Sequence, residues 1–123
     1  MDPWTRPIMD IFGEFYTQSQ IASMIKEKVI EICPLAFMRG RTFKSAFIIA
    51  DEMQNSTPNQ MKMLLTRMGD ESKMVITGDL RQHDRKYDDN GLKDIYEKIK
   101  DKRHKHIECI TFEHADIERS LVV

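Results

Sequence analysis

Two acidic residues stand at the point where an apolar segment ends, and their types suit metal binding and proton transfer. Asp51 and Glu52 follow the apolar run 46–50. One carboxylate of such a pair can accept a hydrogen bond from a metal-bound water, and its neighbour can take a proton from an attacking water or orient it. Acids in this place also mark strands that simply end in solvent, or cap the next helix. The pair alone leaves both interpretations open.

A second apolar run, residues 74–77, ends in Gly78 and Asp79. A glycine lets the backbone approach a ligand closely because it has no Cβ. Asp79 can bind a metal or a water, and the neutral amide of Gln82, which both donates and accepts hydrogen bonds, can sense a terminal phosphate. A simple turn with Asp79 as a local cap is also compatible with these residues. Two such ends on neighbouring strands favour the site interpretation.

The elements that must position these residues are alternating helices and strands. Apolar residues at helical spacing predict helices near residues 7–15, 21–25, 57–68 and 90–99. The third has a capping box of Thr57 and Gln60, with Gly69 expected in the left-handed conformation after its end. Short apolar stretches predict strands at 28–33, 46–50, 74–77 and 107–112, and 46–50 is typical of a strand buried on both faces.

This alternation predicts an α/β fold in which a parallel sheet is flanked by helices. Ligands of such folds bind beyond the carboxyl ends of the strands. The residues that follow positions 50 and 77 are therefore expected to lie at one site.

The composition limits the classes of protein to which this chain can belong. The 123 residues hold 19 Lys and Arg against 20 Asp and Glu, with 41% hydrophobic and 32% charged residues. These values indicate one globular domain rather than a disordered or fibrous chain. No apolar run approaches the length of about 18 residues that indicates a membrane span, and the first residues lack the pattern of a signal peptide. We expect a cytoplasmic protein in which Cys33 and Cys109 are reduced, buried and small, a disulfide or a catalytic thiol being the alternatives.

Several consecutive blocks of sequence occur together and in order: 34–43, 47–55, 57–63, 65–69, 72–79, 90–92 and 116–122. Together they resemble the C-terminal half of the PhoH-like proteins, a phosphate-starvation-inducible ATPase family related to superfamily 1 helicases. The ordered blocks are far more specific than either acidic strand end alone. Met53 and the run 82–85 resemble the branch found in phages and large DNA viruses, for which the compartment would be the host cytoplasm.

The resemblance implies a RecA-like P-loop NTPase core that uses ATP and Mg²⁺. Asp51 and Glu52 match the Walker B acids, with Asp51 holding the metal through water and Glu52 acting as the catalytic base. Gly78, Asp79 and Gln82 match the helicase-type motif that senses the γ-phosphate, with Gln82 catalytic. The other implied contacts are to the nucleotide (Gln54, Gly78, Arg119), to the metal (Asp79), and to nucleic acid or a neighbour's nucleotide (Arg39, Arg41, Arg67). For the arginines, surface positions that cover apolar ground are an equal alternative.

The chain departs from the family in one respect. None of its glycines, at positions 13, 40, 69, 78 and 91, belongs to a Gly-x-x-x-x-Gly-Lys-Ser/Thr loop, whose amides and lysine hold the phosphates. In the family that Walker A loop lies upstream of the part that this chain resembles. We expect residues 1–123 to be the C-terminal part of the NTPase domain, with a helical lead-in at 1–27 and an α/β core at 28–123. Whether this chain is itself an enzyme stays open, because it lacks the phosphate cradle.

Three functions follow as alternatives. The first is the back half of an ATPase that binds or unwinds RNA or another nucleic acid, works with ATP and the missing upstream segment, and assembles with further copies of itself. The second is a truncated, non-hydrolysing module that binds RNA or a protein partner. The third is a gene remnant with an exposed sheet edge and poor solubility.

A basic run follows the last predicted helix. Residues 98–106 contain five Lys or Arg and two His. These cations either favour the C-terminus of the helix and a solvated turn, or bind the phosphates of RNA. No aromatic residues interleave with them for base stacking. The histidines lack metal-ligand spacing, so no zinc site is expected.

Overall fold

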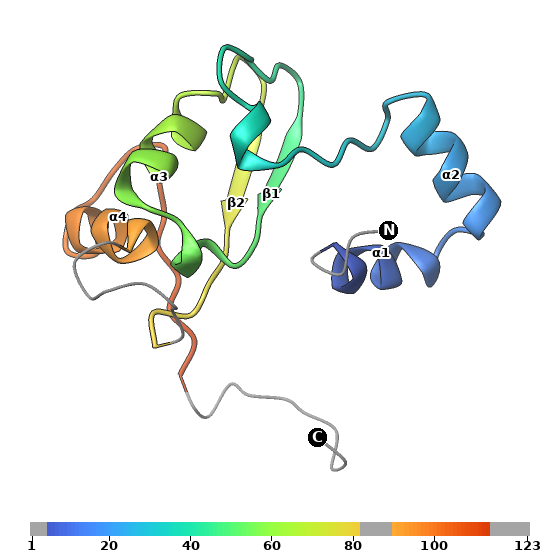
Figure 1. Cartoon of the computed structure of the whole chain (residues 1–123). Coiled ribbons are helices and arrows are strands. Elements are labelled where there is room, and N and C mark those ends of the chain that lie inside the picture. The colour runs from blue at the N-terminus through green and yellow to red at the C-terminus, as the bar shows by residue number, and fades with distance from the viewer. Residues whose placement is uncertain (1–4, 82–89, 114–123) are drawn as a thin grey trace. The chain divides into compact units, whose positions relative to one another are not determined.

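A computed structural model describes residues 5–81 and 90–113 of the chain (Figure 1). The described residues form four α-helices, two short 3₁₀ helices and a two-stranded parallel sheet, which is a small α/β fold consistent with a fragment of a P-loop-like fold. The chain divides into two compact units, Met1–Met38 and Arg39–Val123. None of the helices in the described ranges combines the length and the apolar character needed to cross a membrane.

The first unit contains α1 (Arg6–Gly13) and α2 (Gln18–Lys26), as the helical periodicity predicts. Thr17 caps α2 in a capping box with Gln20. The strand predicted at 28–33 is wrong, because the backbone amides of Val29 and Ile30 turn back to the carbonyl of Met24 at 2.8 and 3.1 Å. This hydrogen bonding closes the end of α2 and leaves these residues irregular. The 3₁₀ helix η1 (Leu35–Phe37) follows.

The second unit is built on β1 (Phe47–Ala50) and β2 (Lys73–Ile76), which pair in parallel as predicted. Their register places Ala50 opposite Ile76. The expectation of burial on both faces is wrong, since Phe47 is 67% exposed and Ile49 47%. Successive side chains of a strand point to opposite faces, and Figure 1 shows α3 and α4 on the same side of the two strands. The described residues of this unit therefore cover only one face of the small sheet.

Two helices and a 3₁₀ helix pack on the covered side of the sheet. They are η2 (Met53–Asn55), α3 (Pro58–Leu65) and α4 (Gly91–Ile99). The predicted capping box of Thr57 and Gln60 is present at the start of α3. The core of this unit consists of Ala50, Met53, Met61 and Leu64, each at most 9% exposed.

Gly69 does not adopt the predicted left-handed conformation, because α3 already ends at Leu65. Gly69 instead lies against the segment that leads into β1, where its amide donates to the carbonyl of Phe43 at 2.6 Å. A Cβ at this position would meet that same carbonyl oxygen at 2.8 Å. The glycine is required for a close backbone approach.

The strand predicted at 107–112 is also wrong. These residues are irregular, and Ile110 and Phe112 are 74% and 81% exposed. An isolated segment has no ladder of hydrogen bonds, and no strand in the described part of the chain pairs with this one. Both cysteines are free thiols as expected, but Cys109 is exposed and Cys33 half-buried, so their predicted burial is wrong.

Candidate functional site

The carboxyl ends of β1 and β2 are joined beyond the strands themselves. The amide of Thr77 donates to the carbonyl of Ala50 at 2.9 Å, and the amide of Met53 donates to the carbonyl of Thr77 at 3.0 Å. The Thr77 hydroxyl donates to Oδ1 of Asp51. Thr77 was not identified from the sequence as a site residue, although its place directly before Gly78 in a parallel strand is a signal that could have found it. It holds the first acid in place.

Glu52 has a left-handed backbone conformation, with φ of 56° and ψ of 38°. A residue with a Cβ rarely adopts this conformation, which costs about 1 kcal/mol or more. The amide of Glu52 donates to Oδ1 of Asp51 at 3.0 Å. The reversal turns the chain from β1 into η2 and leaves both acidic side chains exposed at the sheet edge.

Gln54 links the two strand ends. Its side-chain Nε2 donates to Oε2 of Glu52, and its Oε1 accepts from the backbone amide of Asp79 at 3.1 Å. The residue is only 2% exposed. A buried amide that is bonded at both ends fixes the Glu52 carboxylate relative to the loop after β2. The geometry gives Gln54 a bridging position, and the nucleotide contact predicted for it stays a prediction.

Gly78 permits this bridge. A Cβ on Gly78 would lie 2.6 Å from Oε1 of Gln54 and 2.5 Å from Cδ2 of Leu92 in α4. Real Cβ atoms essentially never approach other atoms so closely. A side chain at position 78 would therefore have to displace the ends of the Gln54 and Leu92 side chains, because the loop after β2 packs directly on the Gln54 amide.

Asp79 begins a tight turn with Arg81. Its Oδ1 accepts from the backbone amide of Arg81 at 2.9 Å and from the guanidinium Nε of Arg81 at 3.3 Å. The backbone hydrogen bond, followed by the side-chain bond and the charge of Arg81, holds the pKa of Asp79 below its ordinary value. Asp79 is therefore ionised at neutral pH.

The start of α4 packs against the segment after η2 and against the loop after β2. Asn90 caps the helix, with its side chain accepting from the amide of Lys93 at 3.1 Å. The amide of Gly91 donates to the carbonyl of Ser56 at 2.7 Å, and a Cβ on Gly91 would lie 2.4 Å from the carbonyl oxygen of Thr57. The helix thus approaches the segment after η2 closely enough to place Leu92 against Gly78.

Two of the three arginines predicted to contact nucleic acid or a neighbouring nucleotide lie at the other end of the sheet. The carbonyl of Arg67 accepts from the amide of Phe43, and the guanidinium of Arg41 lies 4.8 Å from the centroid of the Phe43 ring. Phe43 precedes β1, so these arginines lie near the amino ends of the strands. Arg39 is exposed. Gln82 and Arg119 fall outside the described residues.

Two carboxylate oxygens at the carboxyl edge are candidate donors for a metal ion. Oδ2 of Asp51 and Oδ2 of Asp79 accept no hydrogen bond from the described residues. Within the described ranges, no group of three or more His, Cys, Asp and Glu side chains could hold a metal. Mg²⁺ usually takes one or two carboxylates and completes its shell with waters and substrate phosphates. Oδ2 of Asp51 and Oδ2 of Asp79 are therefore the atoms of this edge that could accept from the waters of such an ion.

Comparison with known proteins identifies relatives of the whole chain. Residues 1–123 match the family model described as PhoH-like protein. A PhoH-like protein of Synechocystis sp. is 42% identical over 127 aligned residues, which cover 100% of this chain and 37% of that protein. A PhoH-like protein of Bacillus subtilis is 49% identical over 84 residues, covering 68% of this chain and 26% of its own length. Protein PhoH of Escherichia coli strain K12 is 40% identical over 84 residues, covering 67% and 24%. The chain spans only the smaller part of each of these relatives.

Proposed function

Because this chain belongs to the PhoH-like protein family, whose members are ATP-binding proteins, we propose that it supplies the metal-binding and water-activating part of an ATP-hydrolysing site. The observation that carries the proposal is the bridge of Gln54 between Glu52 and the amide of Asp79. It couples two acidic strand ends at the sheet edge where ligands of α/β folds bind.

Each acid has a distinct part in the proposed reaction. Oδ2 of Asp51 accepts from a metal-bound water, while Thr77 and the amide of Glu52 hold Oδ1. Glu52, exposed and oriented by Gln54, takes the proton of the water that attacks the γ-phosphate. Mg²⁺, when bound, supplies charge neutralisation at the phosphates. Asp79 contributes a second ionised oxygen to the metal's waters, and Gln82 senses the γ-phosphate.

The phosphate cradle is proposed to lie in the part of the family protein that this chain does not span. The chain contains no Gly-x-x-x-x-Gly-Lys-Ser/Thr loop and covers 37% of the Synechocystis relative. We place residues 1–123 in the C-terminal part of the domain, with the lead-in at 1–27 and the core at 28–123. The helicase relation, the assembly of several copies and the phage or viral branch stay predictions from the resemblance.

Arg41 and Arg67 are placed to act at a site other than the acidic edge formed by Asp51, Glu52 and Asp79. Arg41 and Arg67 lie near the amino ends of the strands, away from Asp51. A contact with the nucleotide of a neighbouring copy, or with nucleic acid, is compatible with that place. Surface packing such as that of Arg41 on Phe43 is the simpler alternative.

The experiment that tests the function is a chimera in which this chain replaces the matching segment of the Synechocystis relative. We expect Mg²⁺-dependent ATP hydrolysis, and we expect Glu52→Gln to lower kcat by about a hundredfold or more, since the proton acceptor is lost. Glu71→Gln is the matched control, because Glu71 is exposed and, among the described residues, its carboxylate accepts a side-chain hydrogen bond only from Ser45. Unchanged kcat in Glu52→Gln would show that Glu52 is not the base.

A second function, a truncated module that binds RNA or a protein partner without hydrolysing ATP, is favoured by one observation, the missing phosphate loop in these 123 residues. We expect the chain alone to bind ATP no more tightly than millimolar by calorimetry, because metal ligands without a cradle leave little binding energy. Micromolar binding would contradict the proposed place of the cradle. A folded chimera that binds ATP but never hydrolyses it would favour the second function.

A further inference from the structure

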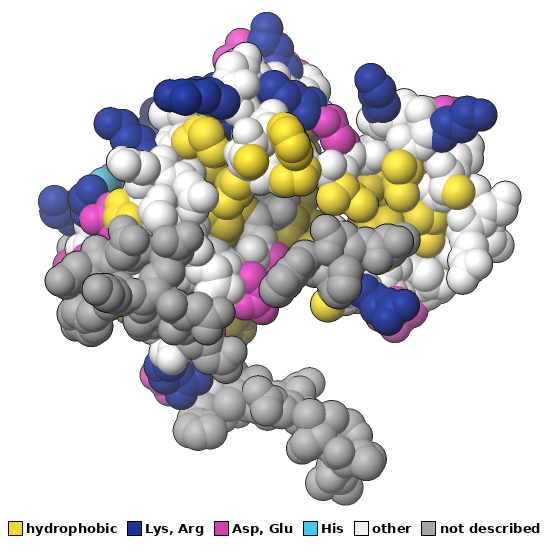
Figure 2. All heavy atoms as spheres, viewed as in Figure 1, with side chains coloured by type: hydrophobic (Ala, Val, Ile, Leu, Met, Phe, Trp, Pro, Cys, Tyr) yellow, Lys and Arg dark blue, Asp and Glu magenta, His cyan; other side chains and the backbone are white. Residues whose placement is uncertain are grey.

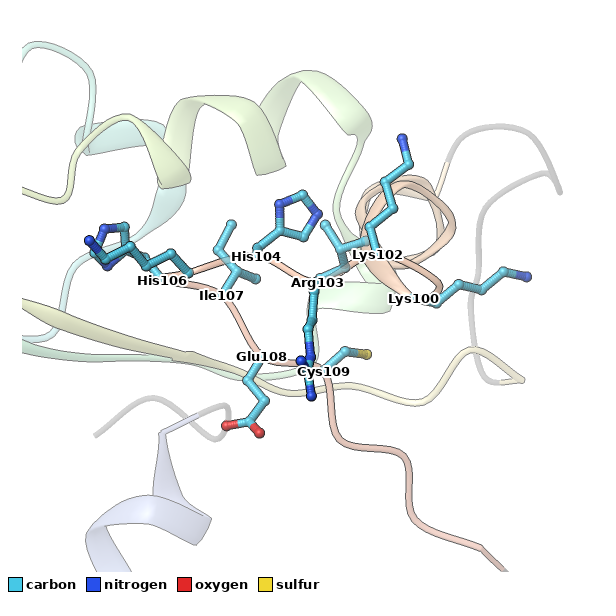
Figure 3. Close-up of a pocket in the computed structure, with 10 residues that line it drawn as sticks. Lys100, Lys102, Arg103, His104, His106, Ile107, Glu108 and Cys109 are labelled. Carbon is cyan, nitrogen blue, oxygen red and sulfur yellow. The ribbon is translucent and has the colours of Figure 1, made fainter.

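The two ends of α4 differ in how the rest of the unit holds them. Beyond Ile99 the chain forms an open hollow of about 520 Å³, lined by residues of the stretch 99–109, and the labelled side chains around it point in different directions (Figure 3). Residues 101–109 are all exposed. At the other end of the helix, Asn90 and Gly91 are buried, and Asn90 is only 2% exposed. The unit therefore encloses the start of α4 and leaves its end open to solvent.

Asn90 and Gly91 form the only Asn-Gly pair in the chain. Asparagine is a labile residue, and a following glycine leaves its own amide nitrogen unshielded because it has no side chain. That nitrogen can attack Cγ of the asparagine. A bond forms between the Gly91 nitrogen and Cγ, the bond from Cγ to Nδ2 breaks, and the proton of the Gly91 nitrogen leaves with the departing ammonia. Water then opens the resulting succinimide ring to aspartate or isoaspartate.

Three contacts of the folded chain oppose this reaction. The Gly91 amide donates to the carbonyl of Ser56 at 2.7 Å, which ties down the nitrogen that must attack. Oδ1 of Asn90 accepts from the amide of Lys93 at 3.1 Å, which fixes the side chain that must be attacked. The carbonyl oxygen of Thr57 would lie 2.4 Å from a Cβ on Gly91, so the backbone there has little room to turn. The fold thus holds both reacting groups in place, and the burial of Asn90 keeps water from them.

The same place contains a polar group that gains from exposure. Nδ2 of Asn90 is buried and has no hydrogen-bond partner among the described residues. A buried donor without a partner costs free energy that hydration would recover. If α4 separates from the segment after η2, water can bind this group, which offsets part of the cost of the separation. The start of α4 is therefore enclosed but carries a built-in tendency to open.

We propose that Asn90 is a deamidation site whose reaction is gated by the contact of α4 with the segment after η2. While Gly91 is bonded to Ser56, Asn90 keeps its side-chain amide. When α4 separates from that segment, the pair reacts as it does in an unfolded chain. Local openings of this kind occur in native proteins at a lower free-energy cost than global unfolding. The modified residue is then a lasting record of an opening of α4.

The two products differ in what they do to the helix. Aspartate at position 90 keeps a side-chain oxygen that can accept from the amide of Lys93. Isoaspartate adds one carbon to the backbone, so the chain cannot keep both this cap and the bond from Gly91 to Ser56. Loss of that bond withdraws Leu92 from Gly78 and disturbs the loop after β2.

The inference goes beyond the proposed ATP site and does not rest on it, because neither nucleotide nor metal takes part in the reaction. The two proposals can therefore fail separately. Glu52→Gln is expected to leave the rate of deamidation unchanged while it removes hydrolysis in the chimera.

The test follows the tryptic peptide 87–93 by chromatography and mass spectrometry while the chain is kept at neutral pH, folded or unfolded in guanidinium chloride. Asn90 is the only residue of this peptide with a side-chain amide, so its mass reports this one site. We expect the unfolded chain to deamidate as fast as a synthetic peptide of the same residues, and the folded chain about tenfold more slowly or less, since only the open form reacts. Equal rates in the folded and unfolded chains would overturn the gate. An unfolded chain that does not react would overturn the site.

Leu92→Ala tests which contact forms the gate. It removes the side chain that packs on Gly78 and leaves the Asn-Gly pair intact. We expect this folded variant to deamidate about threefold faster or more than the original folded chain, with no change in the unfolded rate. Leu92→Val, a smaller change in the same contact, provides the test if the alanine variant does not fold.

The matched control is Ile11→Ala, which removes a side chain of similar size from an exposed position in α1. It should deamidate at the rate of the original folded chain, because α1 belongs to the other unit. Equal acceleration in the variants at positions 11 and 92 would overturn the gate, as would an unchanged rate in the folded variant at position 92.

Asn90→Ser tests the consequence of the modification. Serine keeps an oxygen that can cap α4 and removes the labile amide. After long storage in guanidinium chloride and return to native buffer, we expect the original chain to lose refolded fraction in proportion to its isoaspartate. The serine variant should refold as fully as its fresh form. Equal losses in the two chains would overturn the effect of isoaspartate on the start of α4.

Discussion

Gln54 and Glu52 show how much of the site depends on two side chains and one unusual backbone angle. The left-handed Glu52 turns the chain, and the buried Gln54 amide connects its carboxylate to the loop after β2. A conformation that is unfavourable for a residue with a Cβ persists only where the surroundings impose it. Lys28, Ser45 and Glu71 share the left-handed conformation, so at Glu52 it defines the turn of the chain and does not by itself assign a chemical role.

Two substitutions of Glu52 separate the energetic cost of its left-handed backbone from the loss of its carboxylate. Glu52→Gly and Glu52→Ala both remove the carboxylate, but only alanine keeps the Cβ that opposes a φ of 56°. We expect Glu52→Gly to have a free energy of unfolding about 1 kcal/mol higher than Glu52→Ala, measured by urea denaturation. The same pair of changes at Glu97, inside α4, should give the opposite order, since glycine weakens a helix. The same order at both positions would contradict this account of Glu52.

The turn of Asp79 predicts a dependence on pH. Its pKa is lowered mainly by the backbone amide of Arg81. The stabilisation is therefore present above the ordinary value of 3.8 and is lost as the pH falls through the lower pKa of the folded chain. In a carbon NMR titration, Arg81→Gln should raise the pKa of Asp79 only part of the way, because the backbone donor remains. A complete return to 3.8 would show that the guanidinium is the main cause.

At the scale of elements, the site depends on how closely α4 approaches the segment after η2. Gly91 lies against the carbonyl of Thr57, and this contact places Leu92 beside Gly78. A helix start can come so near another backbone only where no Cβ intervenes. The Asn-Gly pair at the start of α4 therefore serves packing as well as capping.

Gly91→Ala tests this packing. Its Cβ would lie 2.4 Å from the Thr57 carbonyl oxygen, so we expect a loss of about 2 kcal/mol in the free energy of unfolding, with displacement of the loop after β2. Gly13→Ala is the control, because nothing lies within 4 Å of a Cβ there and alanine favours the helical conformation of α1. It should be neutral or stabilising by up to about 1 kcal/mol in the same denaturation assay. If Gly91→Ala left the free energy of unfolding unchanged, α4 could shift away from Thr57 without a loss of stability.

At the scale of the whole molecule, the sheet has an apolar face that the described residues of its own unit leave exposed. Phe47, Ile49 and Val75 are 67%, 47% and 44% exposed, and Figure 2 shows hydrophobic side chains gathered on the visible surface around the strands. Two strands also leave two open edges, which favour pairing with other chains. Exposed apolar surface of this kind is suited to contact with another apolar surface.

We expect the isolated chain to associate as its concentration rises. Ile49→Thr/Val75→Thr should reduce association in sedimentation velocity, since threonine keeps the β-branched shape and removes apolar surface. Val29→Thr/Ile110→Thr removes comparable exposed surface outside the sheet and should change association little. Equal effects of the two double variants would show that the sheet face is not the main contact.

Sequence alone was sufficient for elements whose signals are local. The predicted capping box at Thr57 and the cap at Asn90, where the last helix was expected to begin, satisfy amides three residues away in the chain. The apolar runs also located β1 and β2, and the acids at their carboxyl ends. These features could be predicted because their hydrogen bonds and side-chain periodicity lie within one turn or one strand.

Tertiary structure decided what depends on distant partners. The runs at 28–33 and 107–112 have strand-like sequences but no neighbouring strand among the described residues, and a strand exists only in a ladder. The burial of β1 on one face, and the close approach of Gly69 to Phe43, likewise depend on what packs alongside. In the site, the bonds of Thr77 to Asp51 and of Gln54 to Asp79 join residues 26 and 25 positions apart. The sequence alone determined which acids end the strands, and only the parallel pairing of those strands joined them into one site.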